Sequence, residues 1–151
     1  MNVTFIGLGK LGLPCAEVIA NKGHVVHGYD IKRRPTKNVF QFPTLEGAIS
    51  GADIVFVAVP TPHDPEYDGS APTSHLPNKD FDYRIVKEVL VEANKHMNEN
   101  QLLVLISTVL PGTVREQLAP LDTRTRYVYN PYLIAMGTVA WALVNPEMVM
   151  V

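Results

Sequence analysis

The sequence predicts an α/β fold with a mostly parallel sheet and helices on both faces. Strand-like and helix-like segments alternate along all 151 residues, and this alternation is typical of a doubly wound sheet. Two segments, Ile54–Val59 and Leu102–Ile106, are almost continuously apolar, as expected of strands buried on both faces. The length fits a single domain over residues 1–151 with its own core.

The remaining elements follow from local patterns. The run Val3–Ile6 predicts the first strand, and Val25–Tyr29, which follows the helix stop signal Gly23, predicts the second. The clearest helix covers Phe81–Met97, where apolar residues recur at steps of three and four after the N-cap candidate Asp80. Further predicted strands are Val39–Phe42, Tyr127–Tyr129 and Met148–Val151, and further helices are Lys10–Asn21, Thr44–Ser50, Thr113–Leu118 and Thr138–Leu143.

Two segments break the alternation. Nine residues separate Tyr29 from Val39, fewer than the roughly dozen that a parallel crossover with a helix needs. We therefore expect a shortened segment, a loop, after the second strand. The segment Pro60–Lys79 is rich in Pro, Asp, Ser and Thr and predicts a long loop. It leaves the carboxyl end of a central strand, where open parallel sheets bind ligands.

Composition argues against several kinds of function. The net charge of −2 does not indicate the basic surface that binds nucleic acid. No segment approaches the ~18 apolar residues of a membrane span, and no signal peptide is indicated. The single cysteine, Cys15, shares the phase of Leu11 and Val18 on the first helix, so we expect a buried structural thiol and a cytoplasmic protein. The five histidines show no ligand spacing, so no metal site is expected.

A glycine-rich turn stands between the first strand and the first helix. It comprises Gly7, Leu8, Gly9, Lys10, Leu11 and Gly12. In this strand–turn–helix context G-x-G-x-x-G is typical of a Rossmann-type dinucleotide site, although a glycine turn without a ligand is the alternative. Gly7 would allow the tight turn, Gly9 the close approach of a pyrophosphate, and Gly12 the packing of helix on strand. The helix N-terminus would offer free N–H groups to the phosphates.

An acidic residue follows at the place where such a site needs one. Asp30 ends the second strand, eighteen residues after Gly12, and would accept hydrogen bonds from the adenosine ribose. The basic residues Lys32, Arg33 and Arg34 come next and raise the alternative of NADP. Because Asp30 would repel a 2′-phosphate, NAD is favoured, with the basic residues as a solvated rim and Arg34 beside the adenosine.

Two hydroxyl-bearing segments follow predicted central strands. Val59, Pro60 and Thr61 come after the strand that begins at Ile54, and Ser107–Thr113, which includes Thr108, comes after the strand that begins at Leu102. In a doubly wound sheet both line the crevice that takes the second half of the dinucleotide. The alternative is that these residues only terminate strands.

In these segments the chain resembles the N-terminal NAD-binding domain of the UDP-glucose/GDP-mannose dehydrogenases. The resemblance rests on G-L-G-K-L-G-L-P from Gly7, V-P-T-P from Val59, S-T-V-L-P-G-T from Ser107, and the later Asn130-Pro131 and Asn145-Pro146. It implies oxidation of a nucleotide-sugar C6 alcohol to a uronate with NAD. It also implies that Gly7, Gly9 and Gly12 hold the pyrophosphate, that Asp30 holds the ribose, that Val59, Pro60 and Thr61 flank the adenosine side, and that Thr108 lies near the nicotinamide.

The chain departs from the family pattern where catalysis would be expected. The family motif N-P-E-F-L-x-E-G carries two glutamates, but here Tyr132 and Met136 occupy those positions. Neither side chain acts as an acid or base near neutral pH. The family's nucleophilic cysteine and catalytic lysine belong to later domains, and this chain lacks the central helix and substrate domain. Cys15 cannot replace the nucleophile from the first helix, so we name no catalytic residue.

Three hypotheses remain open at this point. The chain is the cofactor part of a nucleotide-sugar dehydrogenase, completed by a companion chain that carries the substrate domain. Alternatively, it is a stand-alone, non-catalytic nucleotide-binding module, or a dehydrogenase of the hydroxyacid or 6-phosphogluconate type. We predict that it binds the dinucleotide without turnover. The family's dimer helix is absent, and the apolar run Met148–Val151 would offer an edge to a second copy.

Overall fold

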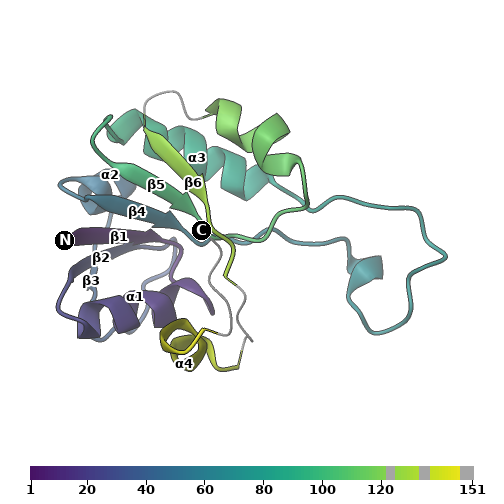
Figure 1. Ribbon diagram of the computed structural model, residues 1–151, viewed down its shortest axis with the longest axis horizontal. Coiled ribbons are helices and arrows are strands. Elements are labelled where there is room, and N and C mark those ends of the chain that lie inside the picture. Colours follow the sequence, from purple (N-terminus) through teal and green to yellow (C-terminus); the bar gives the residue numbers. More distant parts are fainter. Residues whose placement is uncertain (122–124, 133–136, 147–151) are drawn as a thin grey trace.

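A parallel sheet forms the centre of the molecule (Figure 1). The computed structural model describes residues 1–121, 125–132 and 137–146, and within them six strands lie in the order β3-β2-β1-β4-β5-β6. Every neighbouring pair is parallel. The strands are β1 (Asn2–Ile6), β2 (Val25–Tyr29), β3 (Phe40–Gln41), β4 (Ile54–Val57), β5 (Leu102–Leu105) and β6 (Arg126–Tyr129). The chain order reverses between β1 and β4, which is where doubly wound sheets bind ligands. The predicted fold class is confirmed.

Helices cover both faces of the sheet (Figure 1). On one face α1 (Gly12–Asn21) and α4 (Val139–Val144) pack over β1, β2 and β5 through residues such as Cys15 and Val139. On the other face lie α2 (Leu45–Ile49) and α3 (Arg84–His96), with Leu90 fully buried in that core. Each large apolar side chain that is fully buried in this way contributes about 1.5–3 kcal/mol.

Several strands and helices are shorter than predicted. β4 ends at Val57 and β5 at Leu105, so the residues that follow are free to line the edge of the sheet. α1 begins at Gly12 rather than Lys10 because the preceding residues form the bend. α3 begins at Arg84, not Phe81, and Asp80 is not its N-cap. The Asp80 carboxylate instead accepts a hydrogen bond from the N–H of Phe81.

A loop replaces the helix between β2 and β3, as predicted. Gln41 of β3 holds this loop with its side-chain amide. Its Oε1 accepts from the N–H of Arg34 at 3.0 Å, and its Nε2 donates to the carbonyl of Lys32 at 3.2 Å. The segment that follows Asp30 is therefore fixed against the carboxyl end of β2.

The short predicted helices are present in modified form. Thr44 caps α2 by accepting a hydrogen bond from Gly47. The segment after β5 forms a single π-helical turn, η2 (Val114–Leu118), instead of an α-helix, and its Leu118 is buried beside α3. The predicted strand Met148–Val151 lies outside the described residues.

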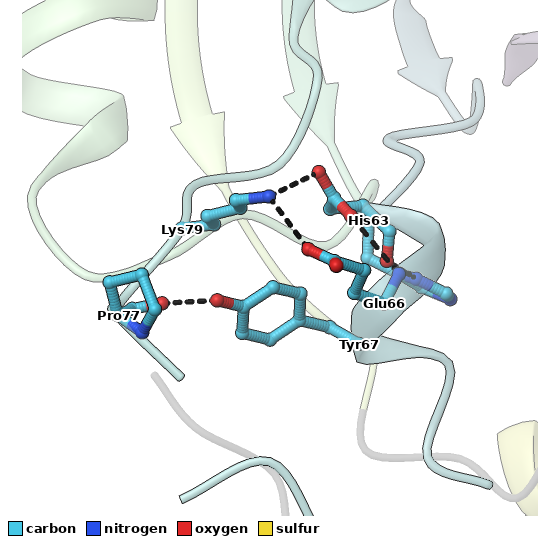
Figure 2. A network of polar contacts seen from close by, with 6 residues as sticks. His63, Glu66, Tyr67, Pro77 and Lys79 are labelled. Carbon is cyan, nitrogen blue, oxygen red and sulfur yellow. Dashed lines mark hydrogen bonds and ion pairs between the residues drawn. The ribbon is translucent and has the colours of Figure 1, made fainter. Parts of the chain in front are cut away.

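The Pro60–Lys79 loop projects away from the sheet and contains one short 3₁₀ turn, η1 (Pro65–Tyr67) (Figure 1). Contacts of its own side chains join the first and last parts of the loop. Lys79 lies 2.8 Å from a carboxylate oxygen of Asp64 and 3.2 Å from one of Glu66, and the Tyr67 hydroxyl donates to the carbonyl of Pro77 (Figure 2). Of this loop, Pro60 and Thr61 line the cleft that is described in the next section.

Candidate functional site

The glycine bend brings strand, helix and neighbouring strand into close contact. Gly7 has φ +93°, and a Cβ built there would lie 2.5 Å from the Ala58 carbonyl oxygen. A Cβ on Gly12 would lie 2.0 Å from the Gly7 carbonyl oxygen. Both positions therefore require glycine to let α1 pack against β1 and β4. A Cβ on Gly9 would meet no atom within 4 Å, so Gly9 faces open space.

The bend also presents backbone donors with no partner inside the protein. Among the described residues, none is hydrogen-bonded to the N–H groups of Gly9, Lys10 and Leu11. No side chain caps α1, and its first turn carries no acidic residue. The positive end of the helix dipole adds to these donors. Such an arrangement is suited to an anion such as a pyrophosphate.

Asp30 lies against this bend. One oxygen of its carboxylate accepts from the N–H of Leu8 at 2.8 Å, and the other accepts from the N–H of Lys32 at 2.8 Å. Only 9% of its side chain is exposed, and the Nε of Arg34 lies 3.8 Å away. Each carboxylate oxygen retains a lone pair after one hydrogen bond. The carboxylate can therefore accept further hydrogen bonds from a ligand in the cleft.

The ends of β4 and β5 are tied to each other by two hydroxyl groups. Thr61 Oγ1 donates to the carbonyl of Thr108 at 2.6 Å, and Ser107 Oγ donates to the carbonyl of Val59 at 2.7 Å. These bonds join loops that lie far apart in the sequence. The two hydroxyl-bearing tips therefore meet at one edge of the sheet, as the sequence predicted.

A buried tyrosine, Tyr83, is hydrogen-bonded to the loop after β5. The hydroxyl of Tyr83 accepts from the N–H of Leu110 at 3.1 Å and lies 3.3 Å from the hydroxyl of Thr113. Burial, together with a hydrogen bond to Asp80, raises the pKa of Tyr83. The neutral phenol therefore remains a fixed anchor at physiological pH.

A cleft of about 570 Å³ runs along this edge. It contains ten of the twelve predicted cofactor residues, namely Gly7, Gly9, Lys10, Leu11, Asp30, Arg34, Val59, Pro60, Thr61 and Thr108. The other two, Leu8 and Gly12, shape the bend from below: Leu8 is 1% exposed, and Gly12 packs on Gly7.

Sequence reasoning did not assign several other residues to the lining. They are Ile6, Tyr29, Ile31, Ala58, Ile85 and Val89. Two residues that were expected there, Lys32 at the rim and Ser107 after β5, also line the cleft. Ile85 and Val89 had been assigned to the apolar face of a helix, which gave no sign that its first turns reach the edge of the sheet. The position of Ile31 between Asp30 and Lys32 could have predicted that Ile31 also lines the cleft.

Cys15 and Tyr132, the two positions weighed for a catalytic role, both contact the core on the α1 face of the sheet. Cys15 is fully buried, and burial raises its thiol pKa to about 12, so the prediction of a buried thiol is confirmed. Tyr132 packs against the same cluster, and burial raises its phenol pKa. Met136 lies outside the described residues. The described residues contain no group of three His, Cys, Asp or Glu placed to hold a metal.

The fold and this cleft define a dinucleotide-binding domain of the Rossmann type. Residues 32–151 match the model of the UDP-glucose/GDP-mannose dehydrogenase family, NAD binding domain. The chain belongs to this family, and NAD is the cofactor of the domain. No helix in the described residues is long and apolar enough to cross a membrane.

Curated relatives carry names from the same family. The UDP-N-acetyl-D-mannosamine dehydrogenase of Methanococcus vannielii is 26% identical over an alignment of 166 positions, which covers 96% of this chain and 37% of that protein. The GDP-mannose 6-dehydrogenase of Pseudomonas aeruginosa is 28% identical over an alignment of 149 positions, which covers 80% of this chain and 31% of that protein. The chain thus spans less than two fifths of the length of either relative.

Solved structures show the same fold. A ternary complex of GDP-mannose dehydrogenase from Pseudomonas aeruginosa matches with a TM-score of 0.80 at 22% identity, covering 99% of this chain and 40% of that one. A UDP-glucose dehydrogenase from the archaeon Pyrobaculum islandicum matches with a TM-score of 0.73 at 23% identity, covering 98% and 39%.

Proposed function

We propose that this chain is the cofactor-binding part of a nucleotide-sugar 6-dehydrogenase and that it binds NAD without turning over a sugar nucleotide alone. The observation that carries the cofactor site is the contact of Asp30 with the bend at Leu8. This contact supports the proposal because it holds a carboxylate beside the unpaired amides at the start of α1, and a dinucleotide site combines a ribose acceptor with such amides.

Each predicted residue receives a role in this proposal. The pyrophosphate is held by the N–H groups of Gly9, Lys10 and Leu11, while Gly7, Leu8 and Gly12 set the shape of the bend. Asp30 accepts hydrogen bonds from the adenosine ribose, with Arg34 beside it. Val59, Pro60 and Thr61 form the wall of the cleft above β4, and Thr108 stands at the far end. When bound, NAD would supply the hydride acceptor.

The lack of turnover follows from the groups that line the cleft. Oxidation of an alcohol needs a base for the hydroxyl proton, and the described lining includes one carboxylate, Asp30, and no histidine or cysteine. Asp30 lies at the adenosine end, where it already accepts two hydrogen bonds. Cys15 is buried and Tyr132 partly buried, and burial raises the pKa of both groups. Both therefore stay protonated near neutral pH, so neither serves as base or nucleophile.

A companion is part of the proposal. Because the chain spans 37% of the length of the M. vannielii relative, an active enzyme would need a substrate domain from elsewhere, either on a companion chain or on a longer polypeptide. A cytoplasmic location is also proposed, since Cys15 is a free thiol and free thiols persist in reducing compartments.

Two measurements test the proposal. Isothermal titration calorimetry with NAD should show saturable binding, and an absence of both heat and thermal shift at millimolar NAD would contradict the cofactor site. A steady-state assay with UDP-glucose, UDP-N-acetylhexosamines and GDP-mannose should give no uronate. Uronate formed by the purified chain would contradict the second half of the proposal.

The alternative, a binding module with no enzymatic partner, is favoured by the aromatic ring at Tyr132 where its family carries a carboxylate. Coexpression with the neighbouring reading frame separates the two. Activity gained with a cysteine-bearing companion supports the dehydrogenase, and NAD binding that no companion converts into activity supports the module.

A further inference from the structure

A second cavity lies beside the loop that follows β5. Its volume is about 570 Å³, within the range of about 300–1,000 Å³ that is usual for small-molecule sites. The second cavity shares no residue of its described lining with the cofactor cleft. Thr108 lines the cleft, whereas the next residue, Val109, lines the second cavity. The loop after β5 therefore contributes to two separate concave surfaces.

A tight turn forms one wall of the second cavity. The N–H of Thr113 donates to the carbonyl of Leu110 at 3.2 Å, and Pro111 and Gly112, with φ +90° at the glycine, lie between them. Proline and glycine at these two positions are typical of a type II turn. Leu110 lines the cavity and is 37% exposed. The turn therefore presents an apolar side chain that the core does not use.

The opposite walls are apolar and are held by the core. Val109 and Val114 line the second cavity, and both belong to or pack against the core cluster on the α3 face of the sheet. Tyr129, at the end of β6, also lines the cavity and packs against that cluster. Because these side chains are anchored in the core, the cavity is preformed and can take the apolar body of a ligand.

Two side-chain donors line the same cavity. The guanidinium of Arg115 forms no ion pair with any residue in the described part of the chain. The hydroxyl of Tyr129 accepts from the N–H of Val109 at 3.4 Å, which leaves its own hydrogen free to donate. The carboxylate of Glu116 approaches Gly112 but is not part of the described lining. The charge of this lining is therefore positive and lies at Arg115.

The donor set favours a carboxylate over other anions. A guanidinium binds a carboxylate through two parallel hydrogen bonds, and one cation balances its single charge. A phosphate monoester carries about 1.5 to 2 negative charges, which one arginine does not balance. The apolar walls favour a ligand whose remaining atoms are hydrocarbon rather than sugar.

We propose that the second cavity binds small organic monocarboxylates that have an apolar body. The carboxylate pairs with Arg115 and accepts a hydrogen bond from Tyr129, and the apolar body lies against Leu110 and Val114. This site is distinct from the proposed cofactor site and does not depend on it.

The probe is 3-phenylpropionate, and 3-phenylpropionamide is its neutral control with the same apolar body. In NMR titrations of the full chain, the acid should shift the backbone amide signals of Gly112, Val114 and Arg115 saturably. It should bind at least about fivefold more tightly than the amide, because the amide forms no charged pair. An acid that produces no saturable shift up to about 50 mM, well above a millimolar dissociation constant, would overturn the proposal. Equal affinity of acid and amide would also overturn it.

A matched pair of arginine variants locates the carboxylate. Arg115→Met should weaken the acid at least about fivefold and leave the amide unchanged, because it removes the charge and keeps an apolar side chain. Arg126→Met is the control: Arg126 begins β6, at the opposite end from Tyr129, and donates to the carbonyl of Asn100 at 3.3 Å. It should change neither affinity. An Arg115→Met chain that keeps its melting temperature and binds the acid normally would overturn the proposal.

Competition with NAD separates the second cavity from the cleft. Saturating NAD should leave the affinity for 3-phenylpropionate within about twofold, since the two sites share no lining residue. Displacement of the acid by NAD would place it in the cleft and overturn the proposal. A chain that binds the acid but not NAD would overturn the cofactor site and support the second cavity as a site of its own.

Discussion

The carboxylate of Asp30 accepts a hydrogen bond from the backbone N–H of Leu8 at 2.8 Å. This contact joins the end of β2 to the bend between β1 and α1. It fixes the orientation of a side chain that is 9% exposed, and it does so without using all of its accepting capacity. Asp30 is thus both a structural clamp for the bend and the proposed acceptor for the ribose.

Replacing Asp30 should reduce the affinity for the cofactor more than it reduces the stability of the fold. In Asp30→Asn one oxygen becomes an NH₂ group that faces the N–H of Lys32 or Leu8, and the negative charge is lost. Hydrogen bonds to charged groups contribute about 1.5–3 kcal/mol, so NAD affinity should fall by roughly tenfold or more, and discrimination against NADP should shrink. Titrations with both dinucleotides measure this.

Asp53 supplies the control. Its carboxylate also accepts a backbone N–H, from Asn2 at 2.7 Å, but it lies just before β4, at the edge of the sheet away from the cleft. Asp53→Asn should leave NAD affinity unchanged. Equal losses in the two variants would mean that Asp30 acts through stability alone.

Two glycines of the bend should respond to alanine in opposite ways. Gly9→Ala adds a Cβ that meets no protein atom, so the melting temperature should hold while the methyl group intrudes into the cleft and NAD affinity falls at least tenfold. Gly12→Ala places a Cβ 2.0 Å from the Gly7 carbonyl oxygen and should destabilise the fold by about 1–3 kcal/mol or more. Urea unfolding and calorimetry compare the two; a Gly9→Ala chain that binds NAD normally would refute the proposed phosphate site.

The Pro60–Lys79 loop should open when its central cation is removed. In Lys79→Met the carboxylates of Asp64 and Glu66 lose their shared partner, and chymotrypsin should then cut faster after Tyr67. Exposed ion pairs contribute little to global stability, so the melting temperature and NAD affinity should hold. Lys95→Met, which removes an exposed ion pair with Glu92 on α3, should leave the cleavage rate unchanged.

Cys15 should make the protein sensitive to alkali. Its thiol pKa is about 12 in the folded chain against 9.0 as the ordinary value. As the pH rises above 9, the unfolded chain loses this proton while the folded chain keeps it, so the free energy of unfolding falls between pH 9 and pH 12. Urea unfolding at pH 8, 9 and 10 measures the slope, which Cys15→Ala should flatten. Iodoacetamide should alkylate Cys15 in urea but not in the native protein.

The sequence predicted those parts of the site that depend on local geometry. The spacing of Gly7, Gly9 and Gly12, and the position of Asp30 at the end of a strand, require only that one β–α–β unit forms. The sheet order then places these residues together. For this reason the core of the cleft could be proposed before its geometry was known.

Other parts of the site depend on contacts between distant segments. The bond from Thr61 to Thr108 spans 47 residues, and nothing in either local pattern indicates that one hydroxyl would be used on the opposite loop. Ile85 was assigned to a helix that was expected to begin at Phe81, yet α3 begins at Arg84. Periodicity identified the apolar face of α3 but not the turns that line the cleft.

The self-contained closure of the Pro60–Lys79 loop has a practical consequence. Because Lys79, Asp64 and Glu66 tie its base, the tip around Gly69 (φ +81°) and Ser70 is exposed. Insertions there need not disturb the sheet or the cleft, so the tip is a natural attachment point for a fluorophore or an affinity handle in the experiments above.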